Sequence, residues 1–297
     1  MARVAPSGRS ARDVLRDPVS ALALATITAM VVAAALAPWV VPSDPLATNL
    51  DHLLAGPSRA HPLGTDGIGR DVLSRLVYGA RWSLGVALLV TTVVTAVGLV
   101  VGAASGYAGG RRLDLAVTWV VDALLAFPTM LLALAVIGAV GPGLRGVLVA
   151  LVAVGWATTA RVVRGEVLAL RERDYVTAAR AMGAPAPAIV GRHVLPNVLS
   201  PLLVLATVEV GQLILALAGL SFLGLGVQSP TPEWGTMINE GRSFLFRKPE
   251  LMIYPGVAIS VAVVAFNVLG DRLRDVLDPR LATGPTDPGA ARLEEQP

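Results

Sequence analysis

The sequence predicts an all-α membrane protein with six transmembrane helices. Hydrophobic residues make up 54% of the 297 residues, charged residues only 15%, and the mean hydropathy is +0.67. Water-soluble domains carry a higher proportion of charged residues, so lipid is the expected solvent for most of this chain. The chain contains no cysteine, which excludes disulfide, thiolate-metal and thiol-nucleophile chemistry.

Six apolar segments are candidates for crossing the hydrocarbon core. A span needs about 20 apolar residues, because a helix rises about 1.5 Å per residue across about 30 Å of hydrocarbon. The expected spans are residues 19–41, 82–104, 123–140, 146–160, 198–220 and 251–269. Arg145 and Arg161 bracket the fourth span, which reaches across the membrane only if both side chains extend to the interfaces.

The first span has a second interpretation as a signal peptide. Four arginines precede it, and Ala35-Leu36-Ala37 resembles a cleavage site. Pro38 follows directly and obstructs cleavage, and the apolar run continues to Val41. An uncleaved transmembrane helix is therefore the preferred interpretation.

The distribution of Arg and Lys between the loops predicts that both termini are cytosolic. With the N-terminus inside, the inner segments hold 16 basic residues and the outer segments hold 8. Basic residues accumulate on the cytoplasmic side of membrane proteins. The chain is accordingly expected to comprise a cytosolic tail (1–18), the first span (19–41), an extracytoplasmic segment with an amphipathic helix (42–81), a five-helix core (82–280) that includes a cytosolic loop (161–197), and a flexible cytosolic tail (281–297).

The cytosolic loop has the pattern of two short helices. Asp174 is expected to cap the first, and Gly183 to end it. Apolar residues at i, i+3, i+4 and i+7 form one face of this helix: Tyr175, Ala178, Ala179 and Met182. Pro187 can open a second helix, expected to end near Leu195 because Pro196 disfavours helical geometry in its predecessor. The apolar face is free to pack on a partner protein, a neighbouring helix or the membrane surface.

This loop resembles the "EAA" loop of bacterial ABC-importer permeases. The resemblance is carried by Ala178-Ala179, Gly183 and Leu195-Pro196. In that family the loop forms a coupling helix seated in a cleft of the ATPase subunit. The resemblance thus implies an ATPase-coupling site formed by Asp174, Tyr175, Ala178, Ala179, Met182, Gly183, Leu195 and Pro196. Thr177 stands where the motif has glutamate, so a contact made by that carboxylate is not carried over.

Three further stretches resemble permeases for dipeptides, oligopeptides and nickel. They are HPLGTD (61–66) with GRDV (69–72), SFLGLG (221–226) running into PTPEWG (230–235), and NVLGD (267–271) with LDPR (277–280). Together with the loop they cover nearly the whole chain, and the first and last resemble the C-type member of the permease pair. Ala216 and Leu217 stand where relatives commonly have an acidic residue, so the role of that acid is not carried over.

The resemblance implies the type I ABC importer permease fold with a cytosolic coupling helix, in a bacterial plasma membrane. Its implied partners are a homologous permease forming a heterodimer, two cytosolic ABC ATPase subunits and an extracytoplasmic solute-binding protein. ATP and Mg are then bound by the partner subunits, and this chain holds no cofactor and is not an enzyme. Lys248, the only lysine, lies outside any Walker A loop.

Other classes of function are weighed against this one. An ATP-independent secondary transporter or channel is the alternative, but it calls for inverted repeats or a chain of ionisable residues through the membrane, and the sequence has neither. An intramembrane hydrolase lacks a G-x-S-x-G motif and an embedded histidine. The arginines are dispersed between apolar runs, so nucleic acid is not an expected partner. The three histidines are scattered, and no metal site is expected.

A few polar and small residues in or near the spans are candidates for special roles. Glu209 lies near the middle of the fifth span, where it either lines the translocation pathway or forms an interhelical tie, with Gln212 as its expected partner. Asp122 is expected to be an interfacial anchor near Arg111 and Arg112. Glycines recur every four residues in the second span and beyond, a spacing that lets another helix approach closely, whereas the pair Gly109-Gly110 is also compatible with a turn. The recurring glycines are Gly98, Gly102, Gly106 and Gly110.

The charged residues at 66–75 have two interpretations. Asp66, Arg70 and Asp71 are conceivable ligands for a metal or a peptide. The preferred interpretation is structural, with Asp71 and Arg75 paired at i, i+4 on an amphipathic helix whose apolar face rests on the membrane or the bundle.

Overall fold

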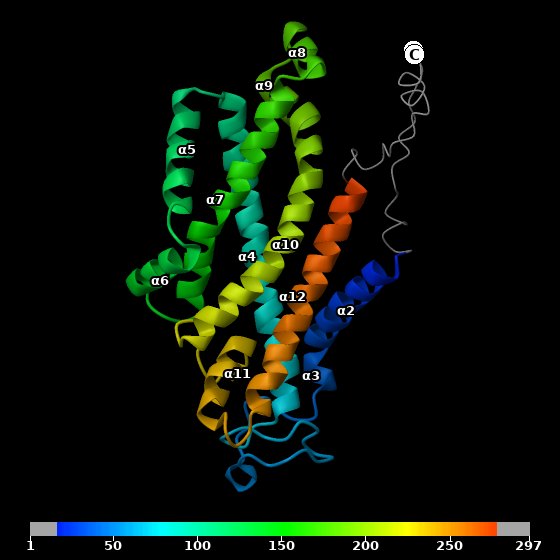
Figure 1. Cartoon of the computed structure of the whole chain (residues 1–297), viewed down its shortest axis with the longest axis vertical. Helices are drawn as coiled ribbons and strands as arrows, with labels where there is room; N and C mark the ends of the chain where they lie inside the picture. The colour runs from blue at the N-terminus through cyan, green and yellow to red at the C-terminus, as the bar shows by residue number, and fades with distance from the viewer. Residues whose placement is uncertain (1–16, 278–297) are drawn as a thin grey trace, which may run out of the picture.

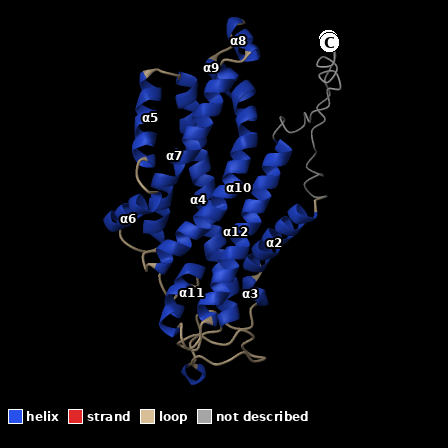
Figure 2. Cartoon of the chain, in the orientation of Figure 1, coloured by secondary structure: helices blue, strands red, loops and turns tan. Residues whose placement is uncertain are grey.

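Long helices lie side by side along the longest axis of the molecule in the computed structural model, which describes residues 17–277 (Figure 1). The long helices are α2 (Pro18–Ala35), α4 (Val72–Ala108), α7 (Leu144–Arg171), α10 (Leu195–Phe222) and α12 (Glu250–Leu277). The shorter ones are α3 (Ala37–Val40), α5 (Arg112–Leu125), α6 (Thr129–Val140), α8 (Asp174–Ala181), α9 (Ala186–Ile189) and α11 (Trp234–Gly241). Loops join them, and within residues 17–277 there is no β-strand (Figure 2).

Five helices are long and apolar enough to cross a membrane, and a bent pair brings the number to six within the described residues. Five of the six predicted spans coincide with α2–α3, α4, α7, α10 and α12. The predicted tails lie outside the described residues apart from Asp17 and Pro18, as do residues 278–280 of the last family-like stretch.

The third span, predicted at 123–140, is broken into two helices. The chain forms α5 and α6, which meet at an angle of 94°. Pro128 is the N-cap of α6 and has no backbone N–H to continue the ladder of α5. The helical segment also begins earlier than predicted, because α5 starts at Arg112.

Two helices extend further than the sequence predicted. The expected amphipathic helix before residue 82 is not separate, because residues 72–81 are the first turns of α4, whose N-cap Asp71 accepts a hydrogen bond from Ser74 N at 2.7 Å. The fourth span continues to Arg171, so residues 161–171, predicted to lie in the loop, are helical. No proline or glycine pair interrupts either sequence, and the helices continue out of the apolar region.

Close packing of α4 on α7 is made possible by the predicted glycine stripe. A Cβ on Gly98 would lie 2.5 Å from Thr159 Cβ, and one on Gly102 would lie 2.5 Å from Ala160 O. Gly106 faces Arg164 O in the same way, whereas Gly110 has a positive φ in the turn that follows α4. The stripe prediction is therefore confirmed for three of its four members.

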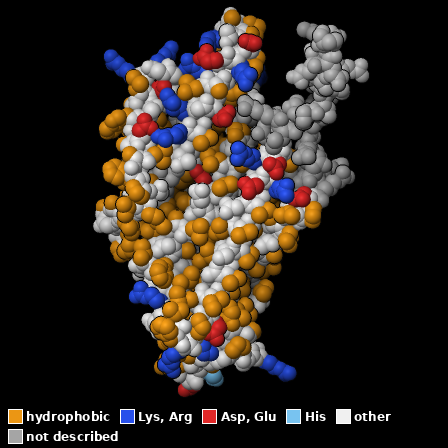
Figure 3. All heavy atoms as spheres, in the orientation of Figure 1, with side chains coloured by type: hydrophobic (Ala, Val, Ile, Leu, Met, Phe, Trp, Pro, Cys, Tyr) orange, Lys and Arg blue, Asp and Glu red, His pale blue; other side chains and the backbone are white. Residues whose placement is uncertain are grey.

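The two ends of the bundle are distinct. The start of α2 and the end of α12 point toward the end that carries α8, and Arg272 Nε is 3.4 Å from Asp17 Oδ2 (Figure 1). We call this the α8 end and the opposite one, with α11 and the start of α4, the α11 end. On the face shown in Figure 3, charged side chains gather toward the two ends and apolar side chains cover the region between them.

Candidate functional site

The loop helix α8 begins and ends through local backbone geometry. Arg173 occupies the N-cap position without a side-chain hydrogen bond, so the prediction that Asp174 is the cap was wrong by one residue, and Asp174 is the first helical residue. At the other end, Gly183 has a φ of 82°, as predicted for a helix stop. Gly183 N donates to Arg180 O at 3.0 Å and Ala184 N to Ala179 O at 3.1 Å, a Schellman motif.

The apolar stripe of α8 divides into an inner and an outer part. Ala179 is buried, together with Val176, which the sequence analysis did not include in the stripe. Both belong to an apolar cluster shared with α7, α10 and Ala103 of α4. Tyr175 and Met182 are 45% and 82% exposed, and Ala178 is exposed as well. The outer part, Tyr175, Ala178 and Met182, is thus an apolar surface that residues 17–277 leave uncovered.

The second helix of the loop was predicted to end near Leu195, but the helical backbone does not end there. The chain runs from α9 through a π-helical turn, Val190–Val194, directly into α10. Pro196 is accommodated in the first turn of α10, where a missing backbone N–H costs little. Ile189 and Val194 are buried in the same cluster as Val176, so the loop packs as one folded unit on α7 and α10.

The junction between α7 and α8 is polar. Glu172 ends α7, and a hydrogen bond from Arg171 Nε, 2.8 Å long, lowers the pKa of the Glu172 carboxyl below its ordinary value. Arg171 also donates through Nη1 to Tyr107 O at 3.2 Å, a carbonyl in the last turn of α4.

Glu209 is buried between helices, and its partner is not the one predicted. Thr159 Oγ1 on α7 donates to Glu209 Oε1 at 2.9 Å, whereas Gln212, three residues further along α10, is exposed. The second oxygen, Oε2, is buried and has no hydrogen-bond partner among the described residues. A polar atom in a span is costly to leave unpaired, which makes Glu209 a candidate for a functional role.

Two acidic residues of α5 pair with α7 at the α8 end. Asp122 pairs with Arg161, and not with Arg111 or Arg112 as predicted, because α7 continues alongside α5 beyond the expected span. Asp114, which the sequence analysis did not single out, is buried and accepts hydrogen bonds from Arg164 Nε at 2.6 Å and Nη2 at 3.0 Å.

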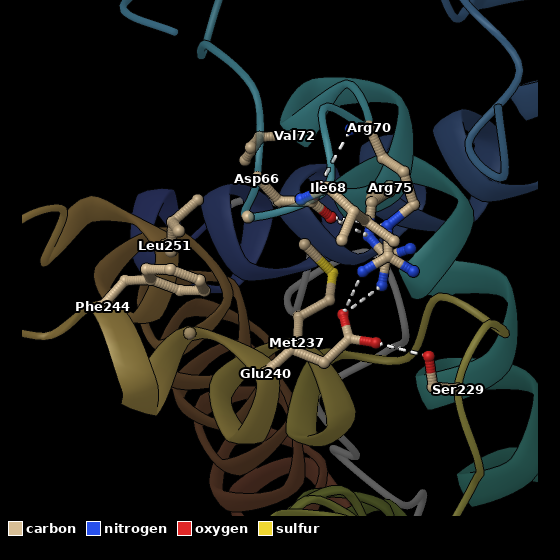
Figure 4. Close-up of a pocket in the computed structure, with 12 residues that line it drawn as sticks. Asp66, Ile68, Arg70, Val72, Arg75, Ser229, Met237, Glu240, Phe244 and Leu251 are labelled. Carbon is tan, nitrogen blue, oxygen red and sulfur yellow. Dashed lines mark hydrogen bonds and ion pairs between the residues drawn. The ribbon is translucent and has the colours of Figure 1, made fainter. Parts of the chain in front are cut away.

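The α11 end holds a buried cluster of four charges. Glu240 Oε2 accepts hydrogen bonds from Arg70 Nη2 and Arg75 Nη2, each at 2.7 Å, and Asp66 Oδ2 accepts one from Arg70 Nε at 2.6 Å (Figure 4). The predicted Asp71–Arg75 pair is wrong. The carboxylate of Asp71 instead caps α4 and lies 2.9 Å from His61 Nδ1, which leaves Arg75 to Glu240.

A cavity of about 270 Å³ lies beside this cluster. Its lining combines the four charged side chains with Met237, Phe244 and Leu251, which Figure 4 shows around the same space. The four charges balance one another, so their arrangement supports the structural interpretation of this segment.

The PTPEWG stretch owes its residue types to its fold. Glu233 is fully buried, caps α11 by accepting from Gly235 N and Thr236 N at 2.9 Å each, and accepts a third bond from Ser83 Oγ at 3.0 Å. Trp234 Nε1 donates to Leu76 O at 3.0 Å. The stretch thus ties the segment after α10 to the start of α4.

This architecture is that of a multi-pass membrane component with a folded helical loop at one end. Residues 98–283 match the family described as "Binding-protein-dependent transport system inner membrane component", and the chain belongs to that family.

Individual relatives agree with the family assignment. The chain is 43% identical to the nickel transport system permease protein NikC of Escherichia coli (strain K12), over 88% of this chain and 94% of the relative. It is 39% identical to the dipeptide transport system permease protein DppC of Alkalihalophilus pseudofirmus, over 94% of this chain and 91% of the relative. A chain of the methionine ABC transporter MetNI, solved in inward-facing conformations, matches with a TM-score of 0.55 and 25% identity, over 69% of this chain and 97% of that one.

Proposed function

We propose that this chain forms half of the translocation pathway of an ATP-driven importer for dipeptides, oligopeptides or a related small solute such as a nickel complex. The observation that carries the proposal is the match, over about nine-tenths of the chain, to permease proteins named for nickel and dipeptide transport. The similarity to the MetNI chain extends this support to the three-dimensional arrangement.

The proposed assembly contains a second, homologous permease, two cytosolic ATPases that bind ATP and Mg, and an extracytoplasmic solute-binding protein. The family description names a binding protein, and the relatives are components of transport systems. The α8 end is the cytosolic end in this proposal, so both termini are cytosolic. The 16-to-8 distribution of basic residues supports that orientation.

In this proposal, the outer part of α8 is the surface that contacts the ATPase. Tyr175, Ala178 and Met182 are apolar, exposed and held on a folded loop, as a helix seated in a partner's cleft requires. Gly183 fixes the end of α8 and thereby its orientation. Leu195 and Pro196 contribute indirectly, because they begin the helix that supports the loop.

Glu209 is the candidate polar group of the pathway. Its Oε2 is buried and unpaired among the described residues, so in this proposal the solute or the second permease reaches it when the helices around it move. The exposed side chain of Gln212 lies one turn of α10 away. The tie to Thr159 supports the other interpretation, in which Glu209 holds α7 and α10 together.

The test is import by the purified complex in proteoliposomes. The chain would be co-expressed with a homologous permease, ATPases and a binding protein from the same genome, and uptake of a radiolabelled dipeptide, a radiolabelled pentapeptide and radioactive Ni²⁺ would be measured with ATP inside. We expect ATP-dependent uptake of one of these probes that requires the binding protein. Uptake that proceeds without ATP and follows an imposed ion gradient would instead establish the secondary-transporter alternative.

A further inference from the structure

A buried carboxylate joins three helices at the α8 end of the bundle. The side chain of Asp114 is 2% exposed and accepts four hydrogen bonds. Two come from Arg164 of α7, one from Ser105 Oγ near the end of α4 at 2.7 Å, and one from Gly110 N in the α4–α5 turn at 2.7 Å. Asp114 itself belongs to the first turn of α5, so α4, α5 and α7 meet at one side chain.

A second arginine fastens α7 to the same turn. Arg171 follows Arg164 by two helical turns and donates to Tyr107 O at 3.2 Å. The backbones of α4 and α7 are close at this point, since a Cβ on Gly106 of α4 would lie 2.8 Å from Arg164 O of α7. The last turn of α4 is therefore held on α7 by hydrogen bonds at two points, with close backbone packing between them.

The same part of α7 supports α8. Asp174, the first residue of α8, lies three residues after Arg171. The inner side chains of α8, Val176 and Ala179, share an apolar cluster with Val163 and Val167, which flank Arg164 on α7. A displacement of α8 is thus imposed on α7 at the position where Arg164 holds Asp114.

We propose that Asp114, Arg164 and Arg171 are positioning residues that form a clamp, through which movement of α8 is transmitted to α4 and α5. This proposal rests on the proposed function, because it concerns how ATP hydrolysis in a partner is converted into movement of the spans. The clamp makes the cytosolic parts of α4, α5, α7 and α8 one rigid unit. With the clamp broken, α8 follows the ATPase while α4 and α5 lag behind, so ATP is hydrolysed with less solute imported.

The chain offers a matched control for the clamp. Asp122 and Arg161 also join α5 to α7, but their side chains are 60% and 52% exposed. Arg161 precedes Arg164 by one turn of the same helix, so the two ion pairs differ mainly in burial and in the additional bonds to α4. If any α5–α7 ion pair is sufficient for coupling, both should matter equally. The clamp predicts that only the buried pair does.

The experiment compares Asp114→Asn, Arg164→Lys and Asp122→Asn in the complete complex, with whichever of the dipeptide, pentapeptide or Ni²⁺ probes the wild type imports. Solute imported per ATP hydrolysed is the readout. We expect Asp114→Asn to lower this ratio about tenfold, as lost coupling between two sites does. Asp122→Asn should change the ratio by less than about twofold, as expected of an exposed pair. Arg164→Lys keeps the charge but loses the two-point contact, and should fall between them.

Assembly and thermal stability of each variant complex separate coupling from folding. A structural role alone would reduce ATPase activity and uptake together and leave their ratio unchanged, and that result would overturn the clamp. A wild-type ratio in Asp114→Asn would overturn it as well. If the Asp114→Asn complex does not assemble, the Arg164→Lys complex provides the test. Its solute imported per ATP hydrolysed is expected to be lower than that of the wild type, and a wild-type value would overturn the clamp. Absence of ATP-dependent import by the wild type would refute the proposed function itself, independently of the variants.

Discussion

The two ends of the bundle differ in how their side chains are satisfied. At the α11 end, Arg75, Glu233 and Trp234 are buried and each has a partner within the chain. At the α8 end, Tyr175 of the eight-residue helix α8 and its C-cap Met182 are exposed. The α11 end is therefore a platform built on a buried polar network, whereas the α8 end presents an apolar surface on a short helix.

The comparison also indicates where mechanical connections lie. The charge cluster at the α11 end joins residues far apart in sequence, Arg70 and Arg75 with Glu240. The clamp at the α8 end joins α4, α5 and α7, and α7 leads directly into α8. Pairing remote from the docking helix suits a rigid platform, whereas a connection beside that helix suits transmission of movement.

The largest expected effect concerns which end faces the cytosol. The cysteine-free chain allows single cysteines at Ser58 and Thr177, both exposed, one at each end of the molecule. With a membrane-impermeant maleimide on intact cells, we expect labelling at position 58 and none at 177, with both reacting after permeabilisation. Labelling at 177 in intact cells would reverse the orientation and assign the binding-protein side to α8.

The next largest effect is expected for the platform itself. Arg75→Ala leaves Asp66 and Glu240 to share Arg70 in a buried site, which should lower the free energy of unfolding by about 3 kcal/mol. The measurement is thermal denaturation of the purified chain in lipid nanodiscs. Arg161→Ala removes half of an exposed pair at the other end and should cost less than about 1 kcal/mol. Equal losses would show that burial does not distinguish the two ends.

Adjacent alanines of α8 give a sharper contrast within one helix. Ala178→Trp places a large ring on the outer surface and should abolish ATPase attachment or stimulated turnover while the isolated chain keeps its stability. Ala179→Trp overpacks the inner cluster and should destabilise the chain by about 1 to 3 kcal/mol. Co-purification of the ATPase and thermal denaturation measure the two effects. Normal ATPase binding and uptake in Ala178→Trp would mean that this surface does not couple the machine.

These contrasts show what the sequence can and cannot predict. Hydropathy located five spans, and the Gly183 stop followed from local backbone chemistry. Pro128 indicated a possible kink, but the 94° angle between α5 and α6 was not predicted, because apolar composition continues across Pro128 and hydropathy does not record direction. Local patterns also placed Asp71 with Arg75, since they cannot reveal Glu240 as a competitor far along the chain.

The candidate site was predicted unevenly for the same reason. The apolar residues of α8 were found from their spacing, but their division into inner and outer parts depends on how α7 approaches, which leaves Val176 inside and Ala178 outside. Asp114 and Arg164 were missed because the sequence placed Arg164 in a loop, whereas it lies on α7. Asp114 follows the two glycines of a tight turn by only four residues, which is the one local signal that it had a structural role.

The smallest expected effect lies between the two ends, at Glu209. If its role is the tie to Thr159, a double-mutant cycle of Thr159→Val and Glu209→Leu should give a coupling of about 0.6 kcal/mol in nanodisc denaturation, typical of interhelical hydrogen bonds in membranes. Uptake by Glu209→Gln should then stay close to wild type, because the amide oxygen still accepts from Thr159. If Glu209 lines the pathway, uptake by Glu209→Leu should fall well beyond what its loss of stability explains, since the donor that meets Oε2 loses its acceptor. Wild-type uptake in both Glu209 variants would remove Glu209 from the pathway and leave only its structural bond to Thr159.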